Sequence, residues 1–109
     1  MTLILSDDVE LEELRREYLH YINVVLPSIS SNNKQYPVYL NHCWARIILD
    51  NICDDKWSNV LDRPAYKALN KYMLKRAINT AKNMVNSIDL AIYLNKRSLG
   101  FRSKSNRKN

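Results

Sequence analysis

Three side chains that could perform acid–base or anion-binding chemistry recur at four-residue intervals near the middle of the chain. His42, Arg46 and Asp50 would line one narrow face of a helix, because residues four apart are neighbours on a helix surface. As a site, the stripe would bind a small anion or substrate, with His42 as general acid or base and Arg46 as the clamp. In a purely structural interpretation, Arg46 would bridge Asp50 or a neighbouring helix, while His42 would cap a helix or pack against its neighbours. We favour the structural interpretation, because structural ion pairs produce the same stripe.

Other signatures of catalysis are missing from the sequence. Cys43 follows His42 directly, but helical neighbours point about 100° apart, so His42 cannot act as its base. The two histidines occur in no zinc-binding spacing, and the chain has no C-x-x-C pair. A single glycine, Gly100, excludes the glycine-rich phosphate loops of the common nucleotide-binding enzymes. We therefore predict no metal and no cofactor, and we favour a protein that is not an enzyme.

Charge divides the chain into two unequal parts. Residues 1–62 hold ten acids and five bases, a net charge of −5, whereas residues 63–109 hold twelve bases and one acid, a net charge of +11. The total is the +6 of the whole chain. So strong an imbalance predicts an anionic partner for the second part, either inside the molecule or outside it.

Four lysines of the segment 63–86 show where an anionic partner is needed. Lys67, Lys71, Lys75 and Lys82 fall within about 80° of one another on a helical wheel. Lysines at i and i+4 repel each other, and the segment contains no acid that would relieve the repulsion. Relief would come from the acidic residues 7–17, from a second subunit, or from the phosphates of a nucleic acid.

We predict a small basic helical protein that binds nucleic acid or another polyanion. The alternative is a regulatory adaptor that binds another protein, including a homodimer in which the acidic and basic parts meet. Tyr66, Tyr72, Tyr93 and Phe101 lie among the bases and could stack on nucleobases, but the three tyrosines fit a core face equally well. The residues predicted to contact phosphates are Arg63, Lys67, Lys71, Lys75, Arg76, Lys82, Arg97, Arg102, Lys104, Arg107 and Lys108.

Apolar residues at three- to four-residue spacing predict the helices that must position these side chains. The predicted segments cover residues 7–26, 37–53, 63–86 and 87–99. Pro27 and the polar run after it are expected to end the first, and Asp62 is expected to cap the third. The apolar positions of the second cover most of its circumference, so we expect it to lie in the middle of the fold. The first six residues could form a strand, although a strand without a partner is not a sheet.

The composition agrees with an all-α fold. One glycine and three prolines are too few for sandwiches, barrels or hairpin-rich folds. We predict a compact bundle of three long helices and one short C-terminal helix, with a single domain over residues 1–100. Gly100 would be the left-handed C-terminal cap of that helix, and residues 101–109 would form a basic tail.

The sequence also indicates where the protein is found. No apolar run reaches the roughly 20 residues of a membrane span, and the first residues lack the basic flank of a signal peptide. Cys43 and Cys53 are ten residues apart in one predicted helix, which places them about 15 Å apart, beyond the reach of a disulfide. Unpaired thiols and the missing signal peptide predict a cytoplasmic protein without membrane contact.

Overall fold

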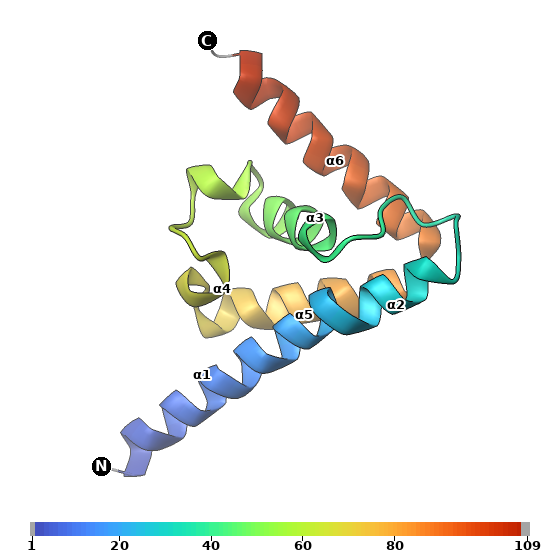
Figure 1. Ribbon diagram of the computed structural model, residues 1–109. Helices are drawn as coiled ribbons and strands as arrows, with labels where there is room; N and C mark the ends of the chain where they lie inside the picture. The colour runs from blue at the N-terminus through green and yellow to red at the C-terminus, as the bar shows by residue number, and fades with distance from the viewer. Residues whose placement is uncertain (1, 108–109) are drawn as a thin grey trace.

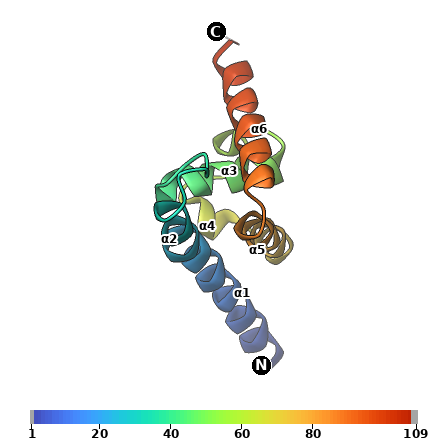
Figure 2. The same cartoon turned by 90° about the vertical axis from the view of Figure 1, so that its right-hand side faces the viewer.

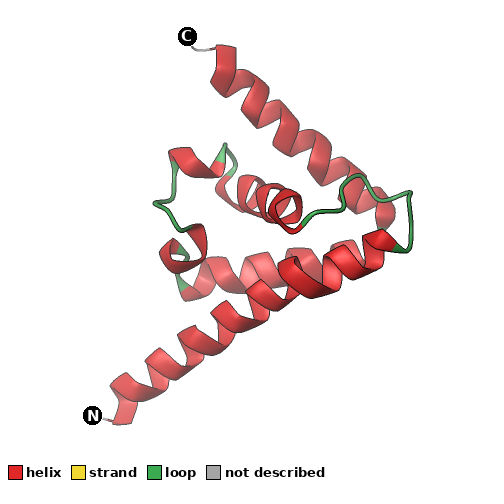
Figure 3. Cartoon of the chain, viewed as in Figure 1, coloured by secondary structure: helices red, strands yellow, loops and turns green. Residues whose placement is uncertain are grey.

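The fold consists of helices joined by short loops (Figures 1 and 3). The computed structural model describes the backbone of residues 2–107 and the side chains of residues 9–103. No strand occurs in this described part, so the predicted all-α class is confirmed. The helices are α1 (Thr2–His20), α2 (Leu26–Ser31), α3 (Asn41–Cys53), α4 (Ala65–Ala68), α5 (Lys71–Val85) and α6 (Ile88–Arg107), with a π-helical turn at Tyr21–Val25 and a 3₁₀ turn at Trp57–Asn59.

The first helix begins earlier and ends later than its sequence predicts. The backbone is helical from Thr2, so residues 2–6 of the stretch considered as a strand belong to a helix, and residue 1 lies outside the described residues. Pro27 does not end the helix, because the π-helical turn just before it shifts the hydrogen-bond register. The Leu26 N–H there bonds to the Tyr21 carbonyl five residues back. This shift accommodates a residue that has no N–H and whose ring crowds the preceding turn.

The third predicted segment is two helices rather than one. Leu69 is extended (φ −74°, ψ 130°) and 2% exposed, so its side chain enters the core at the break between α4 and α5. Asn70 then caps α5, and its side-chain oxygen accepts the Met73 N–H at 2.8 Å. Pro64 is itself the extended residue before α4, so Asp62 does not cap a helix. As a result Lys67 lies on a different helix from the lysines of α5.

The C-terminal helix is longer than predicted. Gly100 lies inside α6 without a positive φ, so it is not a left-handed cap. The first seven residues of the predicted tail, 101–107, continue the helix, and Lys108 lies outside the described residues. A glycine inside a helix costs about 0.5–1 kcal/mol relative to alanine. Contacts of the turns on either side of Gly100 with α3 offset this cost, as the next subsection shows.

Helix α3 occupies the middle of the fold, as its sequence predicts (Figure 1). Trp44, Ile47 and Ile48 are fully buried. Helix α6 packs on α3, and α5 packs against both α1 and α3. The start of α1 and the end of α6 project from opposite ends of the molecule in both views (Figures 1 and 2). Among the described residues, none of the helices combines the length and the hydrophobicity that a membrane span requires.

Replacing Asn70 with alanine tests the cap that separates α4 from α5. We expect Asn70→Ala to lower the free energy of unfolding by about 1 kcal/mol, because the Met73 N–H loses its partner. Asn79→Ala is the matched control, since Asn79 is exposed within the same helix and alanine favours helix. Urea denaturation followed by circular dichroism measures both. Equal stability of the two variants would contradict the assigned cap.

Candidate functional site

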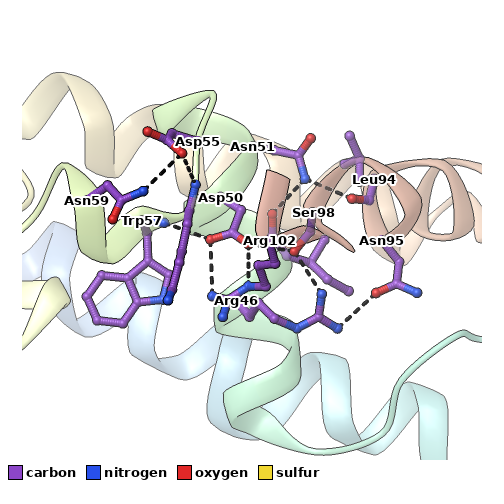
Figure 4. A network of polar contacts seen from close by, with 12 residues as sticks. Arg46, Asp50, Asn51, Asp55, Trp57, Asn59, Leu94, Asn95, Ser98 and Arg102 are labelled. Atoms are coloured by element: carbon purple, nitrogen blue, oxygen red, sulfur yellow. Dashed lines mark hydrogen bonds and ion pairs between the residues drawn. The ribbon is translucent and has the colours of Figure 1, made fainter. Parts of the chain in front are cut away.

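The polar stripe on α3 is centred on Asp50, a carboxylate with 0% exposure. Its Oδ2 accepts hydrogen bonds from Ser98 Oγ at 2.6 Å and from Arg102 Nε at 2.8 Å (Figure 4). Its Oδ1 accepts the backbone N–H of Trp57 at 2.9 Å and Arg102 Nη2 at 3.3 Å. Two residues of α6 and the loop after α3 thus satisfy the carboxylate, so Asp50 is a structural anchor with no oxygen left for a substrate.

Arg46 pairs with the neighbouring helix and not with Asp50. Its Nη1 donates to Ser98 Oγ at 2.8 Å and its Nη2 donates to Asn95 Oδ1 at 2.9 Å. Burial lowers the pKa of the Arg46 guanidinium, and the charge of Arg102 acts in the same direction. Among the described residues no carboxylate lies within ion-pair distance of Arg46.

His42 lies at the other end of the stripe from Asp50. Its side chain is exposed and forms no hydrogen bond to the described residues. Eight residues of helix separate it from Asp50, which corresponds to about 12 Å along the axis. The three residues therefore do not form one acid–base site: the Asp50 oxygens are taken by Ser98, Arg102 and the Trp57 N–H, and Arg46 is bonded to α6.

A second set of contacts fastens α6 to the C-terminal end of α3. The Asn51 amide donates to the Leu94 carbonyl at 2.9 Å and accepts Arg97 Nε at 3.0 Å. Arg97 Nη2 forms an ion pair of 2.6 Å with Asp54, which ends α3 in the left-handed conformation (φ 57°). Arg97 and Arg102, both predicted phosphate ligands, are thus partly engaged inside the molecule. Neither Asn51 nor Ser98 was recognised as part of a site from the sequence.

The lysines of α5 face the acidic residues of α1. Lys71 and Lys75 lie 3.1 and 3.5 Å from the two carboxylate oxygens of Glu10, and Lys82 lies 3.7 Å from Glu17. A hydrogen bond from Lys71 and the charges of both lysines lower the pKa of Glu10. The first source of relief predicted for these lysines, the acidic residues of the same chain, is therefore present. The pairs are exposed, and they hold α1 only weakly.

The remaining predicted phosphate ligands differ in what they contact. The guanidinium of Arg63 lies over the Trp57 ring at 4.9 Å, and Lys67 Nζ lies 5.9 Å from the Tyr66 ring. Lys104 and Arg107 lie on the last turns of α6, where side chains are not described, and Lys108 lies outside the described residues.

A polar groove between α3, α5 and α6 brings two of the predicted phosphate ligands together. The groove, called here the α5–α6 groove, has a volume of about 470 Å³. Arg76 enters it from α5 and Arg97 from α6. Arg76 forms no ion pair with the described residues; its Nη1 lies 3.4 Å from the Ile52 carbonyl. The residues that line the groove are Asn51, Ile52, Asp54, Arg76, Thr80, Asn83, Leu90, Tyr93, Leu94 and Arg97.

Two exposed tyrosines accompany these arginines. Tyr72, 69% exposed, lies under the Arg76 guanidinium at 5.8 Å, and Tyr93, 56% exposed, lines the groove. The prediction that Tyr72 and Tyr93 could belong to a core face is therefore wrong. Phe101, which the sequence offered for stacking on nucleobases, is half-buried, with the Arg97 guanidinium 5.2 Å from its ring. The spacing Tyr-x-x-x-Arg, which occurs once in α5 and once in α6, was the sequence signal for this arrangement.

No metal centre is visible in the part of the chain that the structure describes. No group of three or more histidine, cysteine, aspartate or glutamate side chains comes together there. Cys43 and Cys53 are both unpaired. Burial, with the charges of Asp50 and Asp55, raises the pKa of the Cys53 thiol, which makes it a poor nucleophile.

The buried carboxylate can be tested by the same substitution at two neighbouring sites. We expect Asp50→Asn to lower the free energy of unfolding by about 3 kcal/mol, because Arg102 loses its counter-charge and an amide donor faces other donors. Asp54→Asn should cost less than about 1 kcal/mol, since the Asp54 side chain is 78% exposed and asparagine tolerates the left-handed conformation. Urea denaturation compares them. Similar losses for both would show that Asp50 is not the anchor of α6.

Two constellations of polar residues are thus present around α3. The Asp50 network is closed and structural, whereas the α5–α6 groove is open and combines positive charge with exposed aromatic rings. Comparison of the chain with protein-family models, curated proteins and solved structures finds no match.

Proposed function

We propose that the protein binds single-stranded nucleic acid at the α5–α6 groove. The observation that carries the proposal is the convergence of Arg76 and Arg97, from two helices, on one polar groove beside two exposed tyrosines. Arginine donates two parallel hydrogen bonds to a phosphate, and a tyrosine ring stacks on a nucleobase of any identity. Together these groups suit a strand whose bases are unpaired and accessible.

The two arginines would contribute differently. Arg76 is 3.4 Å from one backbone carbonyl and rests on Tyr72, so its charge is available to a phosphate without breaking an ion pair. Arg97 is bound by Asp54, and a phosphate would have to share this guanidinium or displace a largely exposed carboxylate. Arg76 is therefore the stronger candidate for the first phosphate contact.

The other basic residues would act at longer range. The end of α6, with Lys104 and Arg107 in its sequence, projects from the body and would attract a polyanion without contacting bases (Figure 1). Lys71, Lys75 and Lys82 remain a second placement, because an exposed lysine can exchange a carboxylate for a phosphate. Arg102 is assigned a positioning role, since it neutralises Asp50.

The two unpaired cysteines support the cytoplasmic location proposed for the chain.

Loss of stacking in the groove gives the first test. We expect Tyr93→Ala to weaken binding of a fluorescein-labelled oligothymidylate by about 5- to 150-fold, the range for one stacked base. Arg76→Gln should weaken binding and reduce the slope of log K against log salt by about 0.7, the value for one phosphate on a single strand. Fluorescence anisotropy over a salt titration measures both quantities.

Matched variants decide where the strand lies. Arg16→Gln removes the same charge from an exposed position on α1 and should change binding little. If Lys71→Gln with Lys75→Gln weakens binding and Arg76→Gln does not, the groove is the wrong placement. If the unmodified chain binds no oligonucleotide at low salt, the proposed function is wrong.

The role of the chain end needs a carefully chosen truncation. A chain that ends at Asn95 would lose Ser98 and Arg102, so Asp50 would keep only the Trp57 N–H. A chain that ends at Ser103 retains both partners and removes only residues 104–109. Weaker binding by this second chain would support a contribution from the basic end.

The alternative is a protein-binding adaptor, including a homodimer. Exposed apolar side chains such as Val9 (56%), Val24 (49%) and Leu40 (58%) favour it. The ion pairs between α1 and α5 weaken the head-to-tail form, because they engage acidic and basic residues within one chain. The mass of the protein in solution at low and high salt distinguishes a monomer from a homodimer, since a dimer held by charge would dissociate in salt.

A further inference from the structure

A second pocket, which shares no residue with the α5–α6 groove, lies on another side of α3. It has a volume of about 560 Å³, within the range of small-molecule sites. One wall comes from α1 and the π-helical turn, another from α3, and the third from the loop and helix around residues 57–66. Most of its surface is apolar, and we call it the apolar pocket. The residues that line it are Tyr18, Leu19, Ile22, His42, Ala45, Arg46, Leu49, Trp57, Arg63, Pro64, Ala65 and Tyr66.

The polar members of this lining all carry nitrogen groups or a phenol. His42, Arg46 and Arg63 are among them, and none of the lining residues is a carboxylate. Arg46 is held in place by the neutral groups of Ser98 and Asn95, because the nearby carboxylate of Asp50 is bound to Arg102. Arg63 lies over Trp57, which also lines the pocket. Two guanidinium charges thus border an apolar space without a carboxylate partner among the described residues.

Tyr18 adds a phenol to the same lining. The residue is 1% exposed and belongs to the lining of the pocket. Burial raises the pKa of Tyr18, so the phenol stays protonated and able to donate.

We propose that the apolar pocket binds a small amphipathic anion, a molecule with an aliphatic or aromatic body and a single carboxylate. The body would lie against Leu19, Ile22 and Leu49, replacing water at apolar surface. The carboxylate would lie against the Arg63 guanidinium, which can donate two hydrogen bonds to it, and the charge of Arg46 belongs to the same lining. This site is independent of nucleic-acid binding, because the two pockets have no residue in common.

Decanoate below its micelle concentration is the probe, and decanol is its uncharged counterpart. The fluorescence of Trp57, which lines the pocket, should change on binding, whereas the fully buried Trp44 lies elsewhere in the core. We expect saturable binding of decanoate with one site per chain, and binding of decanol at least about tenfold weaker, the value of one charged hydrogen bond. Trp57→Phe should abolish the fluorescence change, and calorimetry should still detect the binding.

Variants of the charge and of the cavity complete the test. Arg63→Gln should weaken decanoate binding by about tenfold and leave decanol binding unchanged. Arg16→Gln, an exposed arginine outside the pocket, should alter neither. Ala45→Phe should block both ligands by filling the cavity, and circular dichroism would verify that this variant folds.

Three outcomes would overturn the proposal. Equal affinity for decanoate and decanol would show an apolar surface without an anion site. An Arg63→Gln variant that behaves like Arg16→Gln would remove the guanidinium from the site. The absence of saturable decanoate binding to the unmodified chain would refute the site, whether or not oligonucleotides bind at the α5–α6 groove.

Discussion

A buried aspartate on the central helix determines how the C-terminal third of the molecule is arranged. Asp50 is fully enclosed, so its charge had to be neutralised and its oxygens saturated for the fold to be stable. Arg102, Ser98 and the Trp57 backbone N–H do both, and they draw α6 and the loop after α3 onto the same carboxylate. The direction in which α6 leaves the body follows from this anchor.

Both candidate sites depend on that anchor. With α6 held on α3, Arg97 lines the same α5–α6 groove as Arg76. Because Asp50 takes Arg102 as its partner, Arg46 is left with the neutral groups of Ser98 and Asn95 beside the apolar pocket. The Asp50–Arg102 ion pair thus occupies the carboxylate of the stripe on α3. The positive charges of Arg97 and Arg46 are left at the α5–α6 groove and at the apolar pocket.

The helical elements could be predicted in part, for local reasons. Apolar spacing predicted the central position and the end of α3, because a helix buried over most of its circumference is apolar over most of it, but the helix begins at Asn41 and not at residue 37. The errors lie where tertiary packing or a neighbouring cap outweighed a local signal. Pro27 is accommodated by the π-helical turn, Leu69 breaks a helical pattern by entering the core, and Gly100 stays helical in a segment bonded to α3.

The residue types of the candidate sites could be predicted from the sequence, but their arrangement in space could not. The basic character of residues 63–109 and the acidic character of α1 are properties of the sequence, as are the helical class and the burial of α3. Which base meets which acid was decided by the tertiary structure: Asp50 with Arg102, Asp54 with Arg97, and Glu10 with Lys71 lie 43 to 61 residues apart. Helical spacing relates only residues three or four apart, so it suggested Asp50 for Arg46. Pairing across the chain is selected by the packing of whole helices, which no local pattern contains.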